Sequence, residues 1–318
     1  MQTSSDFQGD PDIALDSTLD DHVTVFGIDG QPVRGRAVHL GPAIHSALTG
    51  PEGEERYPPL VARMLGEAMM VGALVARALK FDGRLVVQCH GTNEGAISLL
   101  VADCSSDGDI RGYARWDEDM LKQVTLDNRN PDAEALLGGG TFSMTIDQGP
   151  DMDQYQGLAP IEGATLGACA ESYFNQSEQI PTRVRMAIGQ VQDAGAEPEW
   201  RGGAVMIQKV ADDEARGDTA DAWNTAETLL NTVTDAELID PAVSQNRLLF
   251  RLFHEEGVRI LSQGAITANC KCSRERLEAT LRSFEADAVE EMAENDIISA
   301  NCEFCGTVYD FPIAELLA

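Results

Sequence analysis

The chain has 318 residues, of which 43% are hydrophobic, and its 53 acidic and 23 basic side chains give a formal net charge of −30. Nucleic acids and anionic membrane surfaces are recognised by Lys and Arg, so this charge argues against both as partners. The first 33 residues contain seven aspartates and neither Lys nor Arg, unlike a targeting segment, and no apolar run approaches the ~18 residues of a membrane span. We therefore expect a cytoplasmic protein of about two domains.

The N-terminal part of the chain contains strand-like and helix-like patterns in turn. Residues 1–21 are acidic and polar, and we expect a disordered tail there. Alternating apolar residues predict strands over 22–26 and 34–40, after which Gly41–Pro42 interrupts the pattern. The segment 60–79 is rich in Ala, Leu and Met at helical spacing, which predicts a mostly buried helix.

The next part of the chain contains short apolar runs bounded by Gly, Asn or Asp. These runs predict strands over residues 84–89, 96–102, 112–116, 141–147, 183–188 and 202–210. One helix is expected among them, over 166–175. Because strands and helices mix without a regular βαβ alternation, the pattern favours an α+β fold with a mixed sheet.

Amphipathic helices are expected closer to the C-terminus, over 221–233 and 244–255. They lie between the β-rich part and a cluster of cysteines, so we interpret this region as a helical linker. The predicted organisation is a tail over 1–21, an N-terminal α+β domain over 22–210, a helical linker over 211–263 and a small C-terminal domain over 264–318.

Four of the seven cysteines form a C-x-C pair, Cys270 and Cys272, and a C-x-x-C pair, Cys302 and Cys305. Four thiolates in a tetrahedron at ~2.3 Å are the usual structural zinc site. A reducing cytosol and the small ring of a Cys270–Cys272 disulfide both favour metal-bound thiolates over permanent disulfides. An iron–sulfur cluster is the competing ligand set. We predict one zinc ion at these four cysteines.

Spacing alone leaves the role of this zinc site open between an inert staple and a redox switch. Residues 270–318 carry 4 basic and 11 acidic side chains, which argues against a nucleic-acid-binding zinc ribbon. A helix is expected over 274–284, with Ser273 as its N-cap. A thiol oxidoreductase acting through Cys302–Cys305 is disfavoured, because a strand at 307–311 follows the motif where a helix would be needed.

The other candidate residues point to no catalytic site. Cys89, Cys104 and Cys169 lie among apolar neighbours and are interpreted as small core residues, with an influence on redox behaviour left open. His254 is followed by two glutamates but lacks the second histidine of a zinc-protease motif. The sequence has no nucleophile elbow, kinase signature or phosphate-binding loop, so we do not expect an enzyme.

Several longer segments carry a resemblance to a known family. They are VRGRAVHLGP (33–42), LKFDGRLVVQ (79–88), GYAR (112–115), YQG (155–157), YFNQSEQIPTR (173–183), LLFRLFHEEGV (248–258), CKCSRER (270–276) and CEFC (302–305). With these segments the chain resembles the heat-shock protein 33 family (HslO, the 33-kDa chaperonin), redox-regulated holdase chaperones of the bacterial cytosol. The resemblance runs from about residue 22 to the end.

The resemblance implies a chaperone that is inactive when reduced and zinc-bound. It implies a client-binding N-terminal domain, a linker that covers it, and a C-terminal redox switch. Oxidation would form the disulfides Cys270–Cys272 and Cys302–Cys305, the latter first, with release of zinc and unfolding of switch and linker. The exposed apolar surface would then hold unfolding client proteins without ATP, and the activated chain would form a homodimer. The alternative is a zinc-stapled protein-binding module that never opens.

Overall fold

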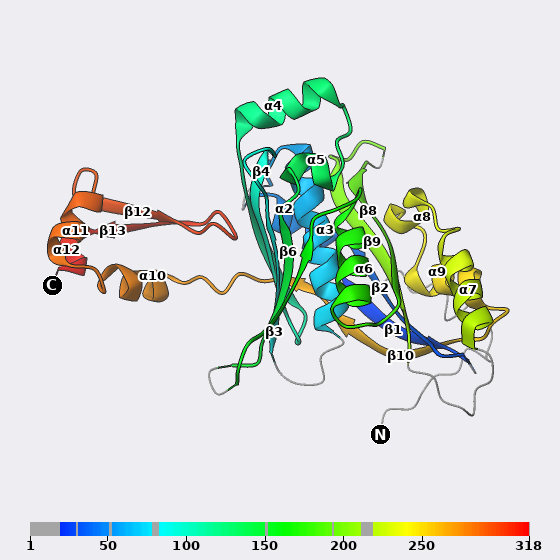
Figure 1. Cartoon of the computed structure of the whole chain (residues 1–318). Helices are drawn as coiled ribbons and strands as arrows, with labels where there is room; N and C mark the ends of the chain where they lie inside the picture. The colour runs from blue at the N-terminus through cyan, green and yellow to red at the C-terminus, as the bar shows by residue number, and fades with distance from the viewer. Residues whose placement is uncertain are drawn as a thin grey trace.

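Two β-sheets enclose a central helix, and a small C-terminal unit projects from the side of this body (Figure 1). The computed structural model describes residues 20–29, 31–50, 53–77, 83–149, 152–192, 194–210 and 219–317. The tail expected over 1–21 lies outside these ranges except for its last two residues. The α+β class predicted from the sequence is confirmed.

The first sheet is antiparallel and has the strand order β10-β1-β2-β9-β8. Its strands are β1 (His22–Ile28), β2 (Val33–Leu40), β8 (Thr182–Val191), β9 (Glu199–Lys209) and β10 (Val258–Ala265). Along β9, Ala204 and Met206 face the central core, while Val205 and Ile207 belong to a second apolar cluster on the opposite face. Because both faces are covered, this strand is a continuous apolar run.

The second sheet has the strand order β11-β5-β4-β3-β6-β7 and is antiparallel except where β11 joins β5. Its strands are β3 (Arg84–His90), β4 (Ile97–Ser105), β5 (Asp109–Trp116), β6 (Thr141–Asp147), β7 (Tyr155–Pro160) and β11 (Thr267–Ala268). Shorter helices border the sheets: α2 (Pro42–Leu48), α4 (Glu118–Asp127), α5 (Ala133–Leu137) and α6 (Leu166–Gln176).

The central helix α3 (Pro59–Ala76) packs between the two sheets, with its residues buried from Val61 to Ala76 except Arg63. Our expectation that no segment approaches a membrane span was wrong for this helix. It is long and apolar enough to cross a membrane by length and composition alone. However, 78% of it is buried inside the protein. The helix of a core enclosed by two sheets must be apolar all round, and this accounts for its composition.

The three dispersed cysteines are part of this core, as predicted. Cys89, Cys104 and Cys169 are each at most 1% exposed. Burial raises the pKa of Cys104 to about 12 and that of Cys169 to about 11, and it also raises the pKa of Cys89. Because the thiolate is the form that oxidants attack, these buried thiols are poor targets. Cys104 also packs closely on α3, where a Cβ at Gly72 would lie 2.5 Å from its Sγ.

The buried carboxyl of Glu67 makes the stability of this core depend on pH. Its Oε2 accepts a hydrogen bond of 2.8 Å from the backbone N–H of Leu166 at the start of α6. Burial raises its pKa from 4.5 to about 7, although this hydrogen bond lowers it. Between these values the folded chain keeps a proton that the unfolded chain has released. The contribution of this group to stability is therefore fully present below pH 4.5 and is lost as pH rises towards 7.

Replacing this side chain in Glu67→Gln should remove that pH dependence. Each pH unit in the window changes the free energy of unfolding by ~1.4 kcal/mol, so wild type should lose on the order of 3 kcal/mol more than the variant between pH 4.5 and 7. Urea denaturation of the reduced chains at several pH values measures the difference. The exposed Glu94→Gln serves as control and should keep the wild-type slope. An equal slope in Glu67→Gln would contradict this account.

Helices α7 (Thr219–Leu230), α8 (Asp235–Ile239) and α9 (Gln245–Phe253) cover the outer face of the first sheet (Figure 1). We call them the covering helices. Their buried side chains join those of the sheet in one apolar cluster, which includes Phe26, Val205, Trp223, Leu230, Leu249 and Phe253. The expected helices over 221–233 and 244–255 correspond to α7 and α9. The region interpreted as a helical linker also contains most of β10, which extends the first sheet at its edge.

The C-terminal unit (residues 270–317) is small. It consists of α10 (Arg274–Leu281), α11 (Ala286–Met292), a hairpin of β12 (Ile297–Asn301) and β13 (Val308–Pro312), and α12 (Ile313–Leu316). Ser273 caps α10 as predicted, because its side chain accepts from the N–H of Arg276. The core of the unit is formed by Leu281, Val289, Ile298, Phe311 and Leu316.

Candidate metal centre

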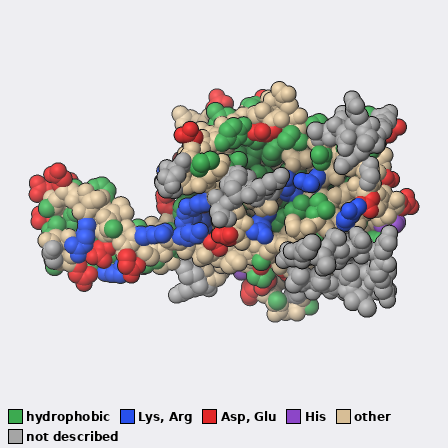
Figure 2. All heavy atoms as spheres, turned by 90° about the horizontal axis from the view of Figure 1, so that it is seen from below, with side chains coloured by type: hydrophobic (Ala, Val, Ile, Leu, Met, Phe, Trp, Pro, Cys, Tyr) green, Lys and Arg blue, Asp and Glu red, His purple; other side chains and the backbone are tan. Residues whose placement is uncertain are grey.

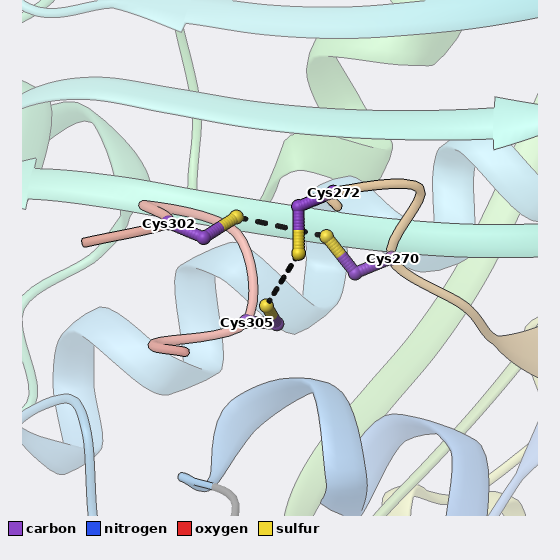
Figure 3. Close-up of side chains that lie close together, drawn as sticks. All are labelled: Cys270, Cys272, Cys302 and Cys305. Atoms are coloured by element: carbon purple, nitrogen blue, oxygen red, sulfur yellow. Dashed lines mark hydrogen bonds between the residues drawn. The ribbon is translucent and has the colours of Figure 1, made fainter. Parts of the chain in front are cut away.

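The four C-terminal cysteines come together in space (Figure 3). Cys270 and Cys272 lie on the segment between β11 and α10, and Cys302 and Cys305 lie in the turn between β12 and β13. Their sulfur atoms all lie within 4.8 Å of one another, with 3.7 Å from Cys270 to Cys302 and 3.4 Å from Cys272 to Cys305. A tetrahedral zinc ion at ~2.3 Å from each sulfur sets its ligands ~3.8 Å apart. The donor set therefore fits zinc.

The β12–β13 hairpin sets the position of Cys302 and Cys305. Asn301 pairs with Val308, and the N–H of Cys302 donates to the carbonyl of Thr307 at 2.9 Å. The chain then reverses through Gly306, whose N–H donates to the carbonyl of Cys302 at 2.8 Å. Gly306 has φ +75°, a left-handed conformation that strains any residue with a Cβ. The Gly after the C-x-x-C motif is thus required by the turn.

Replacing Gly306 with alanine should weaken zinc binding. The left-handed conformation costs a residue with a Cβ about 1–2 kcal/mol. Because zinc binding and folding of such a unit are one equilibrium, this cost appears as a ~5- to 30-fold loss of zinc affinity. Competition with a chromophoric chelator measures it. Gly195→Ala in the β8–β9 turn, at φ +84°, introduces the same strain far from the cysteines and should bind zinc like wild type. Equal affinities for all three chains would contradict the account.

The thiols of the metal-free site hold their protons unequally. Burial raises the pKa of Cys272 to about 12, although its contact with the Tyr309 hydroxyl, at 3.3 Å, lowers it. Partial burial also raises the pKa of Cys305, but hydrogen bonds with Thr307 and the neighbouring thiols outweigh this and bring it to about 7. Four ionised sulfurs at these distances repel one another strongly. A bound dication removes this repulsion and deprotonates its ligands.

Two basic side chains lie at this site, one from the main body and one from the C-terminal unit. Nη1 of Arg111, on β5, lies 4.0 Å from Sγ of Cys270. Arg111 also forms an ion pair with the buried Asp103 at 2.8 Å, which holds the guanidinium in place. Lys271, between the first two cysteines, pairs with Asp109 at 3.3 Å. A zinc ion with four thiolates has a net charge of −2, so nearby cations stabilise it.

All four predicted ligands lie at one site, whereas the basic residues around them were not predicted. Arg111 is 159 residues from Cys270 in sequence, and nothing in the local pattern connects the two. The signals in this region were the strand expected over 112–116 and the GYAR segment quoted for the family resemblance, and neither includes Arg111.

Comparison with known proteins places this architecture in one family. The sequence profile described as Hsp33 protein matches residues 21–312. The 33 kDa chaperonin of Caulobacter vibrioides is 49% identical over 300 residues, covering 94% of this chain and 97% of its own. That of Methylobacillus flagellatus is 34% identical over 295 residues, covering 92% of each chain. The crystal structure of the 33 kDa chaperonin (heat shock protein 33 homolog) of Thermotoga maritima has the same fold, with a TM-score of 0.72 at 20% identity, covering 94% of this chain and 98% of its own. This chain therefore belongs to the Hsp33 family of chaperones.

Proposed function

We propose that this chain is an ATP-independent holdase whose client binding is switched on by oxidation of its four-cysteine site. The single observation that carries the proposal is the convergence of Cys270, Cys272, Cys302 and Cys305 in a chain of this family. In the reduced state these thiolates hold one zinc ion, and the chain is closed. The proposed activity is binding of unfolding proteins in the cytoplasm, with no catalytic step.

Zinc is the main source of stability for the C-terminal unit in this proposal. The unit has only a small apolar core, and its cysteines come from two segments that have no other covalent connection nearby. Zinc binding by such units contributes ~10–16 kcal/mol to folding. Small domains of this size lack an apolar core large enough to replace that contribution. Loss of the metal therefore unfolds the unit.

Oxidation removes the ligands as pairs. In each pair, two thiols transfer two electrons to one hypochlorite and become a disulfide, while the oxidant is reduced to chloride and water. We assign the disulfides as Cys270–Cys272 and Cys302–Cys305, with the C-x-x-C pair reacting first. Such local disulfides leave the two segments free of each other, whereas cross-pairs such as Cys270–Cys302 would keep them joined. Only the local pairing lets the unit open.

The covering helices are the element that this opening affects next. They contain 12, 5 and 9 residues. Isolated helices shorter than ~12–15 residues are marginal in water, so these depend on packing against the first sheet. The chain continues from α9 through β10, which pairs with β1, and through β11, which pairs with β5, to Cys270, so in this proposal the unfolding passes from the C-terminal unit through these two strands to the helices. Their release exposes an apolar face that includes Phe26 and Val205, and the released chains associate as dimers.

The proposal is tested by treating the zinc-loaded chain with hypochlorite. We expect zinc release and suppression of a client's aggregation to rise together, and both to reverse with reductant and zinc. Peptide mapping should find the two local disulfides. A chain that keeps its zinc, or loses it without gaining holdase activity, is a static zinc-stapled module. A chain that instead turns over a disulfide substrate in catalytic amounts is an oxidoreductase.

A further inference from the structure

Basic and aromatic side chains gather on one surface of the main body, where the C-terminal unit meets it. Figure 2 shows basic side chains at this junction. The surface is formed by Arg111, Tyr113 and Arg115 of β5, together with Arg56 from the segment before α3. We call it the β5 platform. Three arginines close together are notable in a chain with only 23 basic residues and a net charge of −30.

The C-x-x-C turn occupies this platform through Phe304. Its ring lies edge-on to the ring of Tyr113, with 4.8 Å between centroids, and the guanidinium of Arg111 lies 4.0 Å from its centroid. An arginine over an aromatic face contributes ~0.5–2 kcal/mol, depending on exposure. The two side chains of the platform thus form an aromatic and cationic site for one ring.

The same turn is also held by its main chain and by its carboxylate. Nη1 of Arg56 donates to the carbonyl of Phe304 at 2.8 Å, and Nη2 donates to the carbonyl of Glu303 at 2.9 Å. Nη2 of Arg115 donates to Oε1 of Glu303 at 2.8 Å. Together, the platform contacts the carboxylate of Glu303, the aromatic ring of the residue that follows it, and the backbone carbonyls of both. Arginine provides the planar donor pair that such recognition needs.

The platform also includes part of the edge of the second sheet. In the second sheet, β11 pairs with β5 only at Asp109 and Ile110. From Gly112 to Trp116, no strand among the described residues pairs with β5 on the side away from β4. The Tyr57 side chain forms a hydrogen bond with the backbone of Ala114 at this edge, so the main chain of a bound segment is contacted by Arg56 and not by an added strand pairing.

We propose that the β5 platform binds extended client segments in which an acidic residue precedes an aromatic one. In the closed chain, Glu303–Phe304 occupies the platform as an intramolecular competitor, and opening of the C-terminal unit frees it. This inference rests on the proposed function, because it names one class of segment that the opened chaperone holds. The strongly negative chain repels acidic segments elsewhere. The platform therefore gives them a place to bind.

The test frees the platform without oxidant. A fluorescein-labelled peptide containing Ser-Glu-Phe-Ser is titrated with reduced, zinc-loaded full-length chains, and fluorescence anisotropy gives its affinity. The double variant Glu303→Ala/Phe304→Ala should bind the peptide at least ~10-fold more tightly than wild type, because the competing ring and carboxylate are gone and only the contacts of Arg56 with the carbonyls of the turn remain. The matched control is Phe284→Ala/Glu285→Ala, which removes the same two residue types from an exposed site in the same unit. It should bind the peptide as wild type does.

A charge exchange then identifies the surface. Adding Arg115→Glu to the double variant should weaken binding of the Ser-Glu-Phe-Ser peptide ~3- to 10-fold, and it should strengthen binding of a Ser-Lys-Phe-Ser peptide. Two results would overturn the proposal. One is equal peptide affinity for wild type and the double variant, and the other is a double variant whose affinity for either peptide does not change when Arg115→Glu is added.

Zinc content is checked for every variant. If the double variant loses its metal, the oxidised wild-type chain and its Arg115→Glu form are compared with the same peptides. Aggregation of a heat-unfolded enzyme is measured separately with the oxidised wild type. Suppression of aggregation without peptide binding refutes the platform alone, whereas failure to suppress aggregation refutes the proposed function.

Discussion

Serine at position 272 is expected to cost the reduced chain its zinc and to make it active without oxidant. Cys272 contributes one of four sulfurs that lie within 4.8 Å of one another. Three remaining thiolates bind zinc far more weakly, and zinc binding contributes ~10–16 kcal/mol to the folding of such units. Metal analysis should find well below one zinc per chain, and limited proteolysis should cut within residues 270–317.

A buried cysteine of the main body provides the control for this variant. Cys169→Ala removes a thiol from the core of the main body, where Sγ contacts the carbonyl of Glu162 at 3.7 Å. It should lower the stability of the core while keeping one zinc ion and the closed, inactive state. If Cys272→Ser loses its zinc and still fails to suppress aggregation in reducing buffer, then the metal does not keep the chaperone inactive.

Removing one side chain from the covering helices should activate the chain with its zinc still bound. Phe253 of α9 is fully buried, and its ring lies 5.7 Å from that of Phe26 on the first sheet. Truncation of a buried Phe to Ala costs ~3–5 kcal/mol. A short helix that depends on packing does not stay in place after this loss of stability, so Phe253→Ala should detach the covering helices from the first sheet. Apolar-dye fluorescence and holdase activity in reducing buffer should both rise.

The neighbouring Phe250 offers a matched control on the same helix. It is only partly buried and stacks on His254, with 5.0 Å between ring centroids. Phe250→Ala should therefore leave both the dye signal and the holdase activity near wild type. An activated dye signal without holdase activity in Phe253→Ala would show that the face beneath α9 is not where clients bind.

The four-cysteine cluster was predictable from the sequence because its signal is local. Each pair of ligands lies within four residues, and only the contact between the two pairs depends on the fold. The function of the site was not predictable from spacing, since a staple and a switch use the same ligands. Resemblance along most of the chain favoured the switch, and the family assignment now supports it.

The elements that the sequence analysis missed are those with weak periodicity. Strands β7 and β10 are exposed at most positions, so their apolar residues do not alternate clearly. Helix α4 is held by its N-cap, Asp117, and has few buried side chains. Glu67 lies within an apolar helical run and gave no signal of its own, because its hydrogen-bond donor is the N–H of Leu166, which is 99 residues away in sequence. Contacts between distant segments leave no local pattern.

The β5 platform also depends on contacts between segments that are far apart in the sequence. Arg56 and Arg111 are 55 residues apart in the printed sequence, and each contacts a turn that lies close to the C-terminus. Charged residues on a strand normally indicate a solvated face. Only the folded chain shows that these arginines face a ring and two carbonyls.

Hydrogen exchange of the covering helices tests the central claim most directly. Mass spectrometry of the reduced, zinc-loaded chain should find the amides of α9 protected, with those of α3 as an internal reference. After oxidation to two disulfides, α9 should be fully exchanged at the shortest labelling time while α3 stays protected. If α9 keeps its protection in an oxidised, zinc-free chain that holds clients, then the cysteine site does not control the covering helices, and the proposed switch is wrong.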